Sequence, residues 1–212
     1  MKKAVIIVVI IVVVLGAGLL VRNRMQHSAP QPSSQAVKPA PNQAYLTLRN
    51  QALTGSRAKF KLPAGPKPTG PWGVLMDMGL PDGWATIAAF SDANASVYFS
   101  NGGGYIGGGG RETIRKAGQN MLAVATEFQP SAHTATEYPL PPTGQTTFYF
   151  LTDAGVFTLS ASQDDLGNRR VPVSKLFFAG QDVINEYRRL QQQGAGAPVS
   201  LPSAQQAPAS RK

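Results

Sequence analysis

The sequence contains no cysteine and only two histidines, His27 and His133, among its 212 residues. Without thiols, the chain has no disulfide, thiol nucleophile, thiolate metal site or cysteine-linked lipid anchor. A zinc site would have to combine carboxylates with a single histidine, which is an uncommon donor set. We therefore predict no metal site and no cofactor.

No arrangement of residues typical of catalysis is present either. Ser131, His133 and Glu137 fall within an irregular, proline-containing stretch at 130–144, and their spacing does not hold the side chains together. Asp164 and Asp165 are adjacent, and adjacent side chains rarely converge on one point, so a solvated turn is favoured. We predict no catalytic residue and favour a protein that is not an enzyme.

Acidic residues are absent from the first 71 positions. All eleven lie in residues 72–192, together with eight of the twenty basic residues. The net charge of +9 therefore arises mainly in the first 71 residues, next to the apolar N-terminus, whereas residues 72–192 carry a net charge of −3. This distribution favours attraction to anionic lipid and argues against a nucleic-acid partner.

One long apolar run, Ala4–Val21, follows Met1-Lys-Lys. Its eighteen residues would form a helix of about 27 Å, close to the roughly 30 Å hydrocarbon core of a bilayer. We predict an uncleaved, single-pass transmembrane anchor in the cell membrane. The alternative is a cleaved signal peptide, for which Gly16-Ala17-Gly18 is the only weak cleavage motif. Basic residues on the two sides are nearly balanced, so orientation stays open, with an extracytoplasmic domain preferred.

Composition divides the rest of the chain. We predict a short N-terminal tail at 1–3, the anchor at 4–21, a disordered Pro/Gln/Ser linker at 22–41, a globular domain at 42–192 and a disordered tail at 193–212. Within the domain, Arg57, Lys59 and Lys61 alternate with Ala58, Phe60 and Leu62. This segment is either a lipid-surface patch or a solvated linker or edge strand, and the second interpretation is favoured.

Hydrophobic periodicity predicts an α+β domain with a five-stranded antiparallel sheet in the order α-βββ-α-ββ-α. The expected strands are 73–79, 84–91, 95–100, 145–152 and 155–162, and the expected helices are 42–53, 110–129 and 174–192. Much of the core is expected from Val74, Met76, Ile87, Val97, Phe99, Ile114, Met121, Phe128, Phe150, Leu159, Phe177 and Ile184. Both faces of Trp84–Phe90 are apolar, which predicts a central strand covered on one side by helices and on the other by a further helix or a partner.

A glycine-rich loop, Asn101–Gly110, connects the third expected strand to the second helix. Gly102, Gly104 and Gly107 match a dinucleotide fingerprint, and glycine backbone at a helix N-terminus can bind an anion. The fingerprint belongs to a βαβ unit, whereas the preceding strand here belongs to a meander. We therefore predict that these glycines are needed chiefly for backbone geometry, with any ligand role secondary. The candidate ligand-binding residues are Gly102, Gly104, Gly107, Gly110, Arg111 and Arg115. Asp77, if exposed, would be the nearest titratable group.

The stretch Trp72–Gly110 resembles a small bacterial domain family of unknown function. The similarity rests on Trp72–Gly79, Gly83–Thr86 and Tyr98–Gly104. It implies a bacterial source and a common domain, and it transfers no activity. The order of elements is also similar to the profilin-like and roadblock/longin class, whose members often serve as interaction platforms. That second likeness is an analogy of architecture only.

Two functional hypotheses follow. The first is a membrane-tethered, non-catalytic protein-interaction module of unknown process. It would contact the bilayer through residues 4–21 and a protein partner, or a second copy, through an apolar sheet or helix face. The second is a small-anion or nucleotide-binding domain that uses Gly102–Gly110. A broad apolar patch would favour the first hypothesis, and a concave pocket at the glycine loop would favour the second.

Overall fold

The computed structural model describes residues 38–67, 70–194 and 199–200. The helices among them are α1 (Gln43–Thr54), α2 (Glu112–Phe128), α3 (Gln163–Gly167) and α4 (Ser174–Gln192), with short 3-10 turns η1 (Gly108–Gly110) and η2 (Gln129–Ser131). The strands are β1 (Gly73–Leu80), β2 (Gly83–Phe90), β3 (Ala95–Phe99), β4 (Gly103–Tyr105), β5 (His133–Thr134), β6 (Gln145–Thr152), β7 (Gly155–Ser162) and β8 (Val199–Ser200). The α+β class is confirmed.

The sheet is antiparallel and larger than predicted. Its order is β5-β7-β6-β1-β2-β3-β4, and the two-residue β8 adds to the outer edge of β4. The prediction of five strands was therefore wrong: residues 70–194 supply seven. The two missed strands, β4 and β5, have three and two residues. Strands this short are below the length at which an apolar alternation can be recognised.

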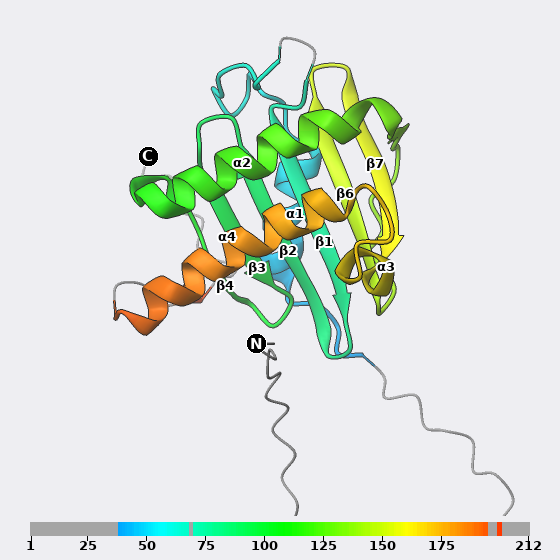
Figure 1. Ribbon diagram of the computed structural model, residues 1–212. Coiled ribbons are helices and arrows are strands. Elements are labelled where there is room, and N and C mark those ends of the chain that lie inside the picture. Colours follow the sequence, from blue (N-terminus) through cyan, green and yellow to red (C-terminus); the bar gives the residue numbers. More distant parts are fainter. Residues whose placement is uncertain (1–37, 68–69, 195–198, 201–212) are drawn as a thin grey trace, which may run out of the picture. The chain divides into compact units, whose positions relative to one another are not determined.

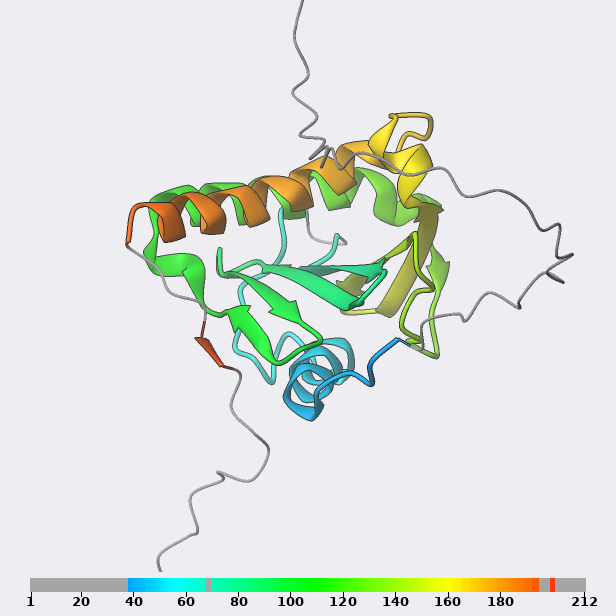
Figure 2. The ribbon, with the colours of Figure 1, turned by 90° about the horizontal axis from the view of Figure 1, so that it is seen from below.

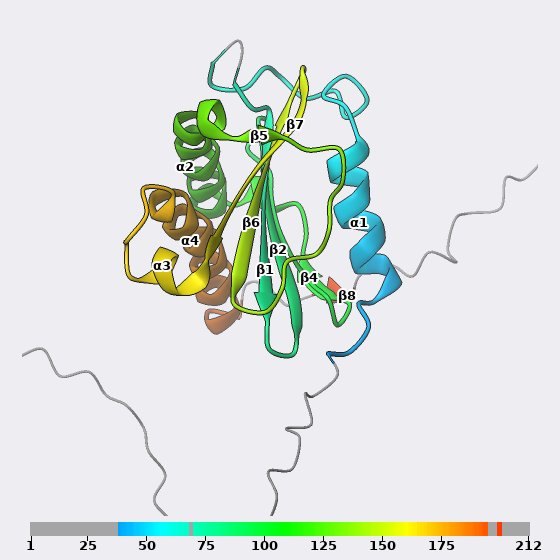
Figure 3. The same cartoon turned by 90° about the vertical axis from the view of Figure 1, so that its right-hand side faces the viewer.

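Helices cover both faces of this sheet. Figure 1 shows α2 and α4 side by side in front of the strands, and Figures 2 and 3 show α1 alone on the opposite face. The strand β2 lies in the middle of the sheet and is almost entirely buried. The prediction of a central strand with two covered faces is confirmed. The cover that the sequence left undecided is α1, a helix of the same chain.

Two apolar clusters correspond to the two faces. The larger one lies between the sheet and the α2–α4 layer, and the smaller one lies beneath α1. All twelve residues that the sequence predicted for the core belong to the larger cluster, eight of them buried and four packed at its margin (Phe99, Phe128, Leu159 and Phe177). The face of the central strands that packs against α1 is also apolar, and it includes Leu75, Ala88 and Tyr149.

The start of α1 is fixed to the sheet by Asn42. Its side-chain Oδ1 accepts a hydrogen bond from the Ala44 backbone N–H at 2.8 Å, which is the usual contact of an N-capping residue. Its own N–H donates to the Ser100 carbonyl at 2.8 Å. One residue therefore sets both where the helix begins and where it lies on the sheet.

None of the helices formed by the described residues is long and apolar enough to cross a membrane. The described structure thus contains no counterpart of the transmembrane helix that formed part of the predicted fold class. The residues predicted to form it, 4–21, lie outside the described residues, as do most of the predicted linker and C-terminal tail.

Candidate functional site

The glycine loop forms two successive structures. Gly103 and Gly104 enter β4, where Gly104 lies opposite Tyr98 of β3. Gly107 then adopts a left-handed conformation, with φ of 70°, and leads into the 3-10 turn η1 before α2. Gly102 also has a positive φ, of 90°. Both conformations suit glycine because a Cβ atom would strain the backbone.

Side chains of the same chain already bind several N–H groups of this loop. Ser96 Oγ accepts from the Gly107 N–H at 3.2 Å, and Asn94 Oδ1 accepts from the Gly109 N–H at 3.1 Å. Asn101 Oδ1 accepts from the Gly103 N–H at 3.0 Å. An anion held by the loop backbone would have to displace these contacts, so the geometry supports a structural role for the glycines.

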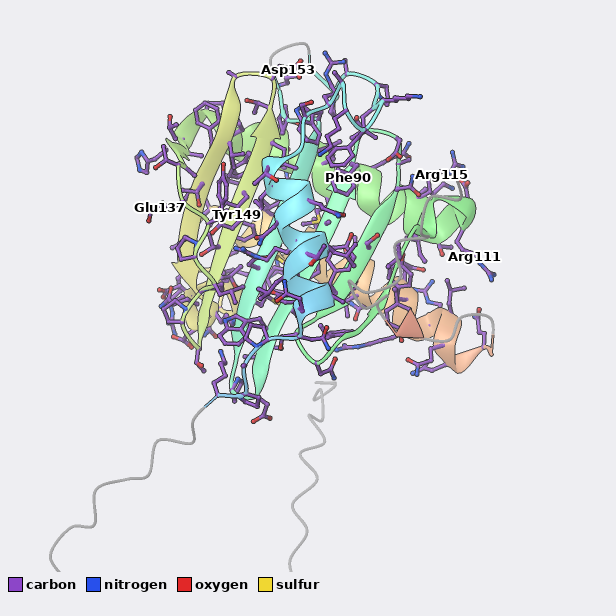
Figure 4. The ribbon with its side chains drawn as sticks, turned by 180° about the vertical axis from the view of Figure 1, so that it is seen from behind. Phe90, Arg111, Arg115, Glu137, Tyr149 and Asp153 are labelled. Atoms are coloured by element: carbon purple, nitrogen blue, oxygen red, sulfur yellow. The ribbon has the colours of Figure 1, made fainter. Side chains whose placement is uncertain are left out.

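The predicted ligand residues are divided between the two ends of the loop. Gly102 and Gly104 lie at the sheet edge, whereas Arg111 and Arg115 lie at the N-terminal end of α2, as Figure 4 shows for the two arginines. The Arg115 guanidinium forms an ion pair with Glu112 one turn earlier in the same helix. That contact directs Arg115 along its own helix. A ligand role for these six residues stays a prediction.

Asp77 is not the exposed group that the sequence allowed. Its carboxylate is completely buried beneath α1 and accepts from the Arg49 Nε–H at 2.7 Å and from the Thr86 hydroxyl at 2.6 Å. Since the Thr86 proton is used for Asp77, the Tyr45 hydroxyl must donate to Thr86 Oγ1 at 2.9 Å. The result is a polar cluster within an apolar layer.

The same cluster extends to the connection before β6. Arg49 Nη2 and the Tyr149 hydroxyl both donate to the Pro139 carbonyl, at 3.2 and 3.0 Å. Burial raises the pKa of Asp77, while Arg49 and Thr86 oppose that shift. Burial likewise raises the pKa of Tyr149 to about 12. Because each of these polar groups is paired within the chain, we interpret the cluster as the attachment of α1 to the sheet.

A groove lies on the α1 face, between α1 and the β3 residues Ser96 and Tyr98. Its volume is ≈ 310 Å³, and Figure 4 shows Phe90, one of its lining residues, beside α1. The groove is lined by Leu48, Gln51, Ala52, Phe60, Leu62, Phe90, Asp92, Asn94, Ser96, Tyr98, Ile106 and Gly107. Phe60 and Ile106 are 37% and 47% exposed, and they are the two large apolar side chains that the described residues expose to this degree.

A second hollow, of ≈ 380 Å³, lies on the opposite face between β3, β4 and the C-terminal half of α4. It is lined by Val97, Phe99, Asn101, Gly103, Gly104, Tyr105, Ile184, Tyr187, Arg188 and Gln191. The glycine loop therefore has a concave surface on each side. A concave pocket at this loop was the outcome expected of an anion site, but both hollows are lined mainly by side chains from outside the glycines. The sequence could not identify these lining residues, because they are far apart along the chain.

A third hollow, of ≈ 570 Å³, lies on the outer side of α2 and α4 and contains Arg169, Arg170 and Lys175. Its three basic groups already have partners. Arg170 pairs with Asp164 and Asp165 of α3, and Lys175 pairs with Glu127. The Arg169 guanidinium lies 4.1 Å from the centre of the Phe178 ring. We assign this hollow a structural role, in holding the short α3 against the longer helices.

The described residues contain no group of three or more acidic or histidine side chains that could hold a metal ion. His133 is exposed in the short strand β5 and pairs there with Thr158 of β7 through the backbone. The two-residue sequence Asp164–Asp165 belongs to α3, a helix that the sequence interpretation as a turn missed.

In comparisons with known proteins, no family model matches the chain, and no curated protein or solved structure is significantly similar to it.

Proposed function

We propose that this domain is a non-catalytic protein-interaction module and that the groove beside α1 receives a segment of its partner. One observation carries the proposal: the two most exposed large apolar side chains of the described surface, Phe60 and Ile106, line the same groove. Isolated exposed apolar residues are ordinary on protein surfaces, whereas residues gathered around a concave site indicate recognition. Phe90, Leu48 and Leu62 extend the apolar lining.

The charges near the groove define the partner. Lys59 and Lys61 flank Phe60, both are exposed, and no ion pair involves either of them within the described residues. Asp92 also lines the groove, and its carboxylate accepts hydrogen bonds from the backbone N–H and the side-chain amide of Asn94. A complementary segment would therefore insert apolar side chains into the groove and place acidic residues next to the two lysines.

The double apolar face of β2 no longer supports an external partner. The sequence allowed a partner to provide the second cover, and α1 provides it instead. The surface proposed for binding therefore lies at the margin of α1 and not on the central strands.

A location at the cell membrane is part of the proposal and rests on sequence. The apolar residues 4–21 would hold the chain at a bilayer, and the Pro/Gln/Ser-rich stretch that follows would act as a tether that lets the domain contact partners at a distance from the membrane. Fractionation tests this part. The full chain should remain in the membrane pellet after a carbonate wash, and a chain beginning at residue 26 should be soluble. A full-length protein that carbonate releases would contradict it.

Site-specific photo-crosslinking in the source cells tests the groove. A benzoyl-phenylalanine placed at Ile106 should give a discrete adduct, and the same probe at Asn185, which is exposed on α4, should not. The adduct at 106 should disappear when Lys59→Glu and Lys61→Glu are combined in the same chain. Adducts of equal yield at both positions would reject the groove as the binding surface. An adduct at 106 whose yield is unchanged by the two lysine substitutions would reject it as well.

A further inference from the structure

The hollow between β4 and α4 exists because β4 has no side chain at Gly103. Alternation along the strand places Gly103 and Tyr105 on the same side of the sheet. The Tyr105 ring occupies the space between β4 and α4 at its own position, where it stacks on the Tyr187 ring with ring centres 4.7 Å apart. A Cβ atom built at Gly103 would have only the Asn101 side chain within 4 Å, at 3.3 Å. An ordinary strand residue here would fill the space that glycine leaves open.

The floor of this hollow is apolar, and its tyrosine hydroxyl groups are already bonded. Val97, Ile184 and Tyr187 are buried, and Phe99 is partly buried beside them. The Tyr187 hydroxyl donates to the Ala95 carbonyl at 2.7 Å, and the Tyr105 hydroxyl donates to Gln191 Oε1 at 2.7 Å. The two tyrosines therefore offer ring surface to a ligand.

Hydrogen-bond donors gather at the rim. Arg188 lies one residue after Tyr187 and lines the hollow together with Gln191 and Asn101. The ion pairs found among the described residues do not include Arg188, whereas the next residue, Arg189, pairs with Glu186 at 2.9 Å. The side-chain oxygens of Gln191 and Asn101 accept internal hydrogen bonds, which leaves their amide N–H groups as donors.

We propose that this hollow is a binding site for a small apolar carboxylate, such as a medium-chain fatty acid. The hydrocarbon part would lie on Val97, Phe99, Ile184 and the tyrosine rings, and the carboxylate would accept from Arg188 at the rim. A volume of ≈ 380 Å³ lies in the range of small-ligand sites, which are mostly apolar with a few polar groups that fix orientation. One guanidinium suits a single carboxylate better than a polyphosphate.

This site is independent of the proposed protein-binding groove. The two hollows lie on opposite faces of the sheet, and their lining residues do not overlap. Loss of partner binding in groove variants would therefore leave carboxylate binding unchanged, and each proposal can fail without the other.

Equilibrium dialysis of radiolabelled octanoate against the full chain in phosphatidylcholine nanodiscs tests the site, with empty nanodiscs as the blank. Saturable binding above the blank is expected. Octan-1-ol should compete, because it has the same chain, and acetate should not, because it lacks one. Binding no greater than that of empty nanodiscs, or equal competition by acetate, would overturn the proposal.

Three variants locate the binding. Arg188→Gln should weaken octanoate binding by about tenfold, as expected for loss of a charge-assisted hydrogen bond, and should leave octan-1-ol unaffected. Arg189→Gln makes the same charge change one residue later, outside the hollow, and should bind octanoate normally. Gly103→Val should abolish binding of both ligands by filling the cavity. Equal loss in Arg188→Gln and Arg189→Gln, or normal binding by a folded Gly103→Val chain, would place the ligand elsewhere. Should Gly103→Val fail to fold, the arginine pair still decides the question.

Discussion

The Arg49 guanidinium and the Asp77 carboxylate form an ion pair at 2.7 Å that is almost completely buried between α1 and the centre of the sheet. Arg49 comes from α1, and Asp77 comes from the middle of β1, opposite Thr86 of β2. Burying two charges is costly unless each is paired and hydrogen-bonded, and this pair meets both conditions. The contact fixes the position of α1, and with it one wall of the proposed protein-binding groove.

Removing one partner of this pair should be far more damaging than removing both. Arg49→Met leaves the buried carboxylate without its counter-charge, so the free energy of unfolding should fall by about 3–5 kcal/mol. Asp77→Leu leaves the guanidinium buried and should cost a similar amount. The double variant should lose less than either single variant, because neither charge is then left buried without its partner. Urea unfolding of a chain beginning at residue 26, followed by tryptophan fluorescence, measures this cycle, and strictly additive losses would contradict the coupling.

The buried tyrosines make the domain sensitive to alkali. Burial raises the pKa of both Tyr149 and Tyr187 to about 12, and it raises the pKa of Tyr45 and Tyr98 as well. In the unfolded chain these groups titrate near a pKa of about 10. Because the unfolded chain releases the protons first, their stabilisation is complete below about pH 10 and is lost as the pH rises through about 12.

A spectrophotometric titration near 295 nm measures this effect directly. In the folded chain, part of the tyrosinate absorbance should develop only above about pH 11, and in urea all six tyrosines should titrate together near pH 10. The urea midpoint should fall steadily over the same interval. Identical titration curves for the folded and unfolded chain would show that the rings are accessible to solvent.

Sequence patterns predicted the long elements because each carries its own periodic signal. Three long helices and five long strands were expected, and all of them are present within a few residues of the predicted boundaries. The same method missed β4, β5 and α3, which are too short to display a period. It also counted the sheet as five strands, since pairing at the edges depends on backbone contacts that leave no side-chain pattern.

The candidate sites were less accessible to sequence reasoning. The role of Asp77 depends on Arg49 and Tyr149, which lie 28 and 72 positions away, and a lone aspartate in an apolar strand does not identify its partners. Phe60 was noticed only as part of a basic, alternating segment. In the folded chain Phe60 lines the same groove as Ile106, a residue of the glycine loop, and this shared lining is what makes it a candidate for partner binding.

Gly118 of α2 lies where the helix packs closely on the sheet. A Cβ atom built there would lie 2.9 Å from the Ala95 Cβ atom of β3. Gly118→Ala should therefore destabilise the domain by about 1–3 kcal/mol, although alanine favours a helix by about 1 kcal/mol. Gly167→Ala is the control, since a Cβ atom there has nothing within 4 Å. An increased urea midpoint for Gly118→Ala would contradict this prediction, because it would mean that α2 can move away from the sheet without a loss of stability.

The glycine loop gives the sharpest test of the two original hypotheses. Gly107 has a positive φ and free space around its Cα, so Gly107→Ala should cost about 1 kcal/mol through backbone strain alone. In Gly108→Ala, the new Cβ atom would lie 2.3 Å from the Tyr187 hydroxyl oxygen and 2.4 Å from Ile114, so the cost should be larger. Gly110→Ala meets no atom within 4 Å and has no positive φ, so it should be nearly silent. For Gly104, which lies in β4 without a positive φ, the strain argument does not apply.

An anion site would produce a different order of effects. Inorganic phosphate or a nucleotide would raise the urea midpoint of the wild-type chain, and Arg111→Ala would remove that gain. If the glycines act only through geometry, added phosphate should leave the midpoint unchanged, and Arg111→Ala should respond to phosphate as the wild type does. The internal hydrogen bonds from the Gly103, Gly107 and Gly109 N–H groups favour this second result, because a bound anion would have to break contacts that the fold already makes. Stabilisation by phosphate that depends on Arg111 would show that the anion supplies better partners than Ser96 and Asn94, and the loop would then be a ligand site.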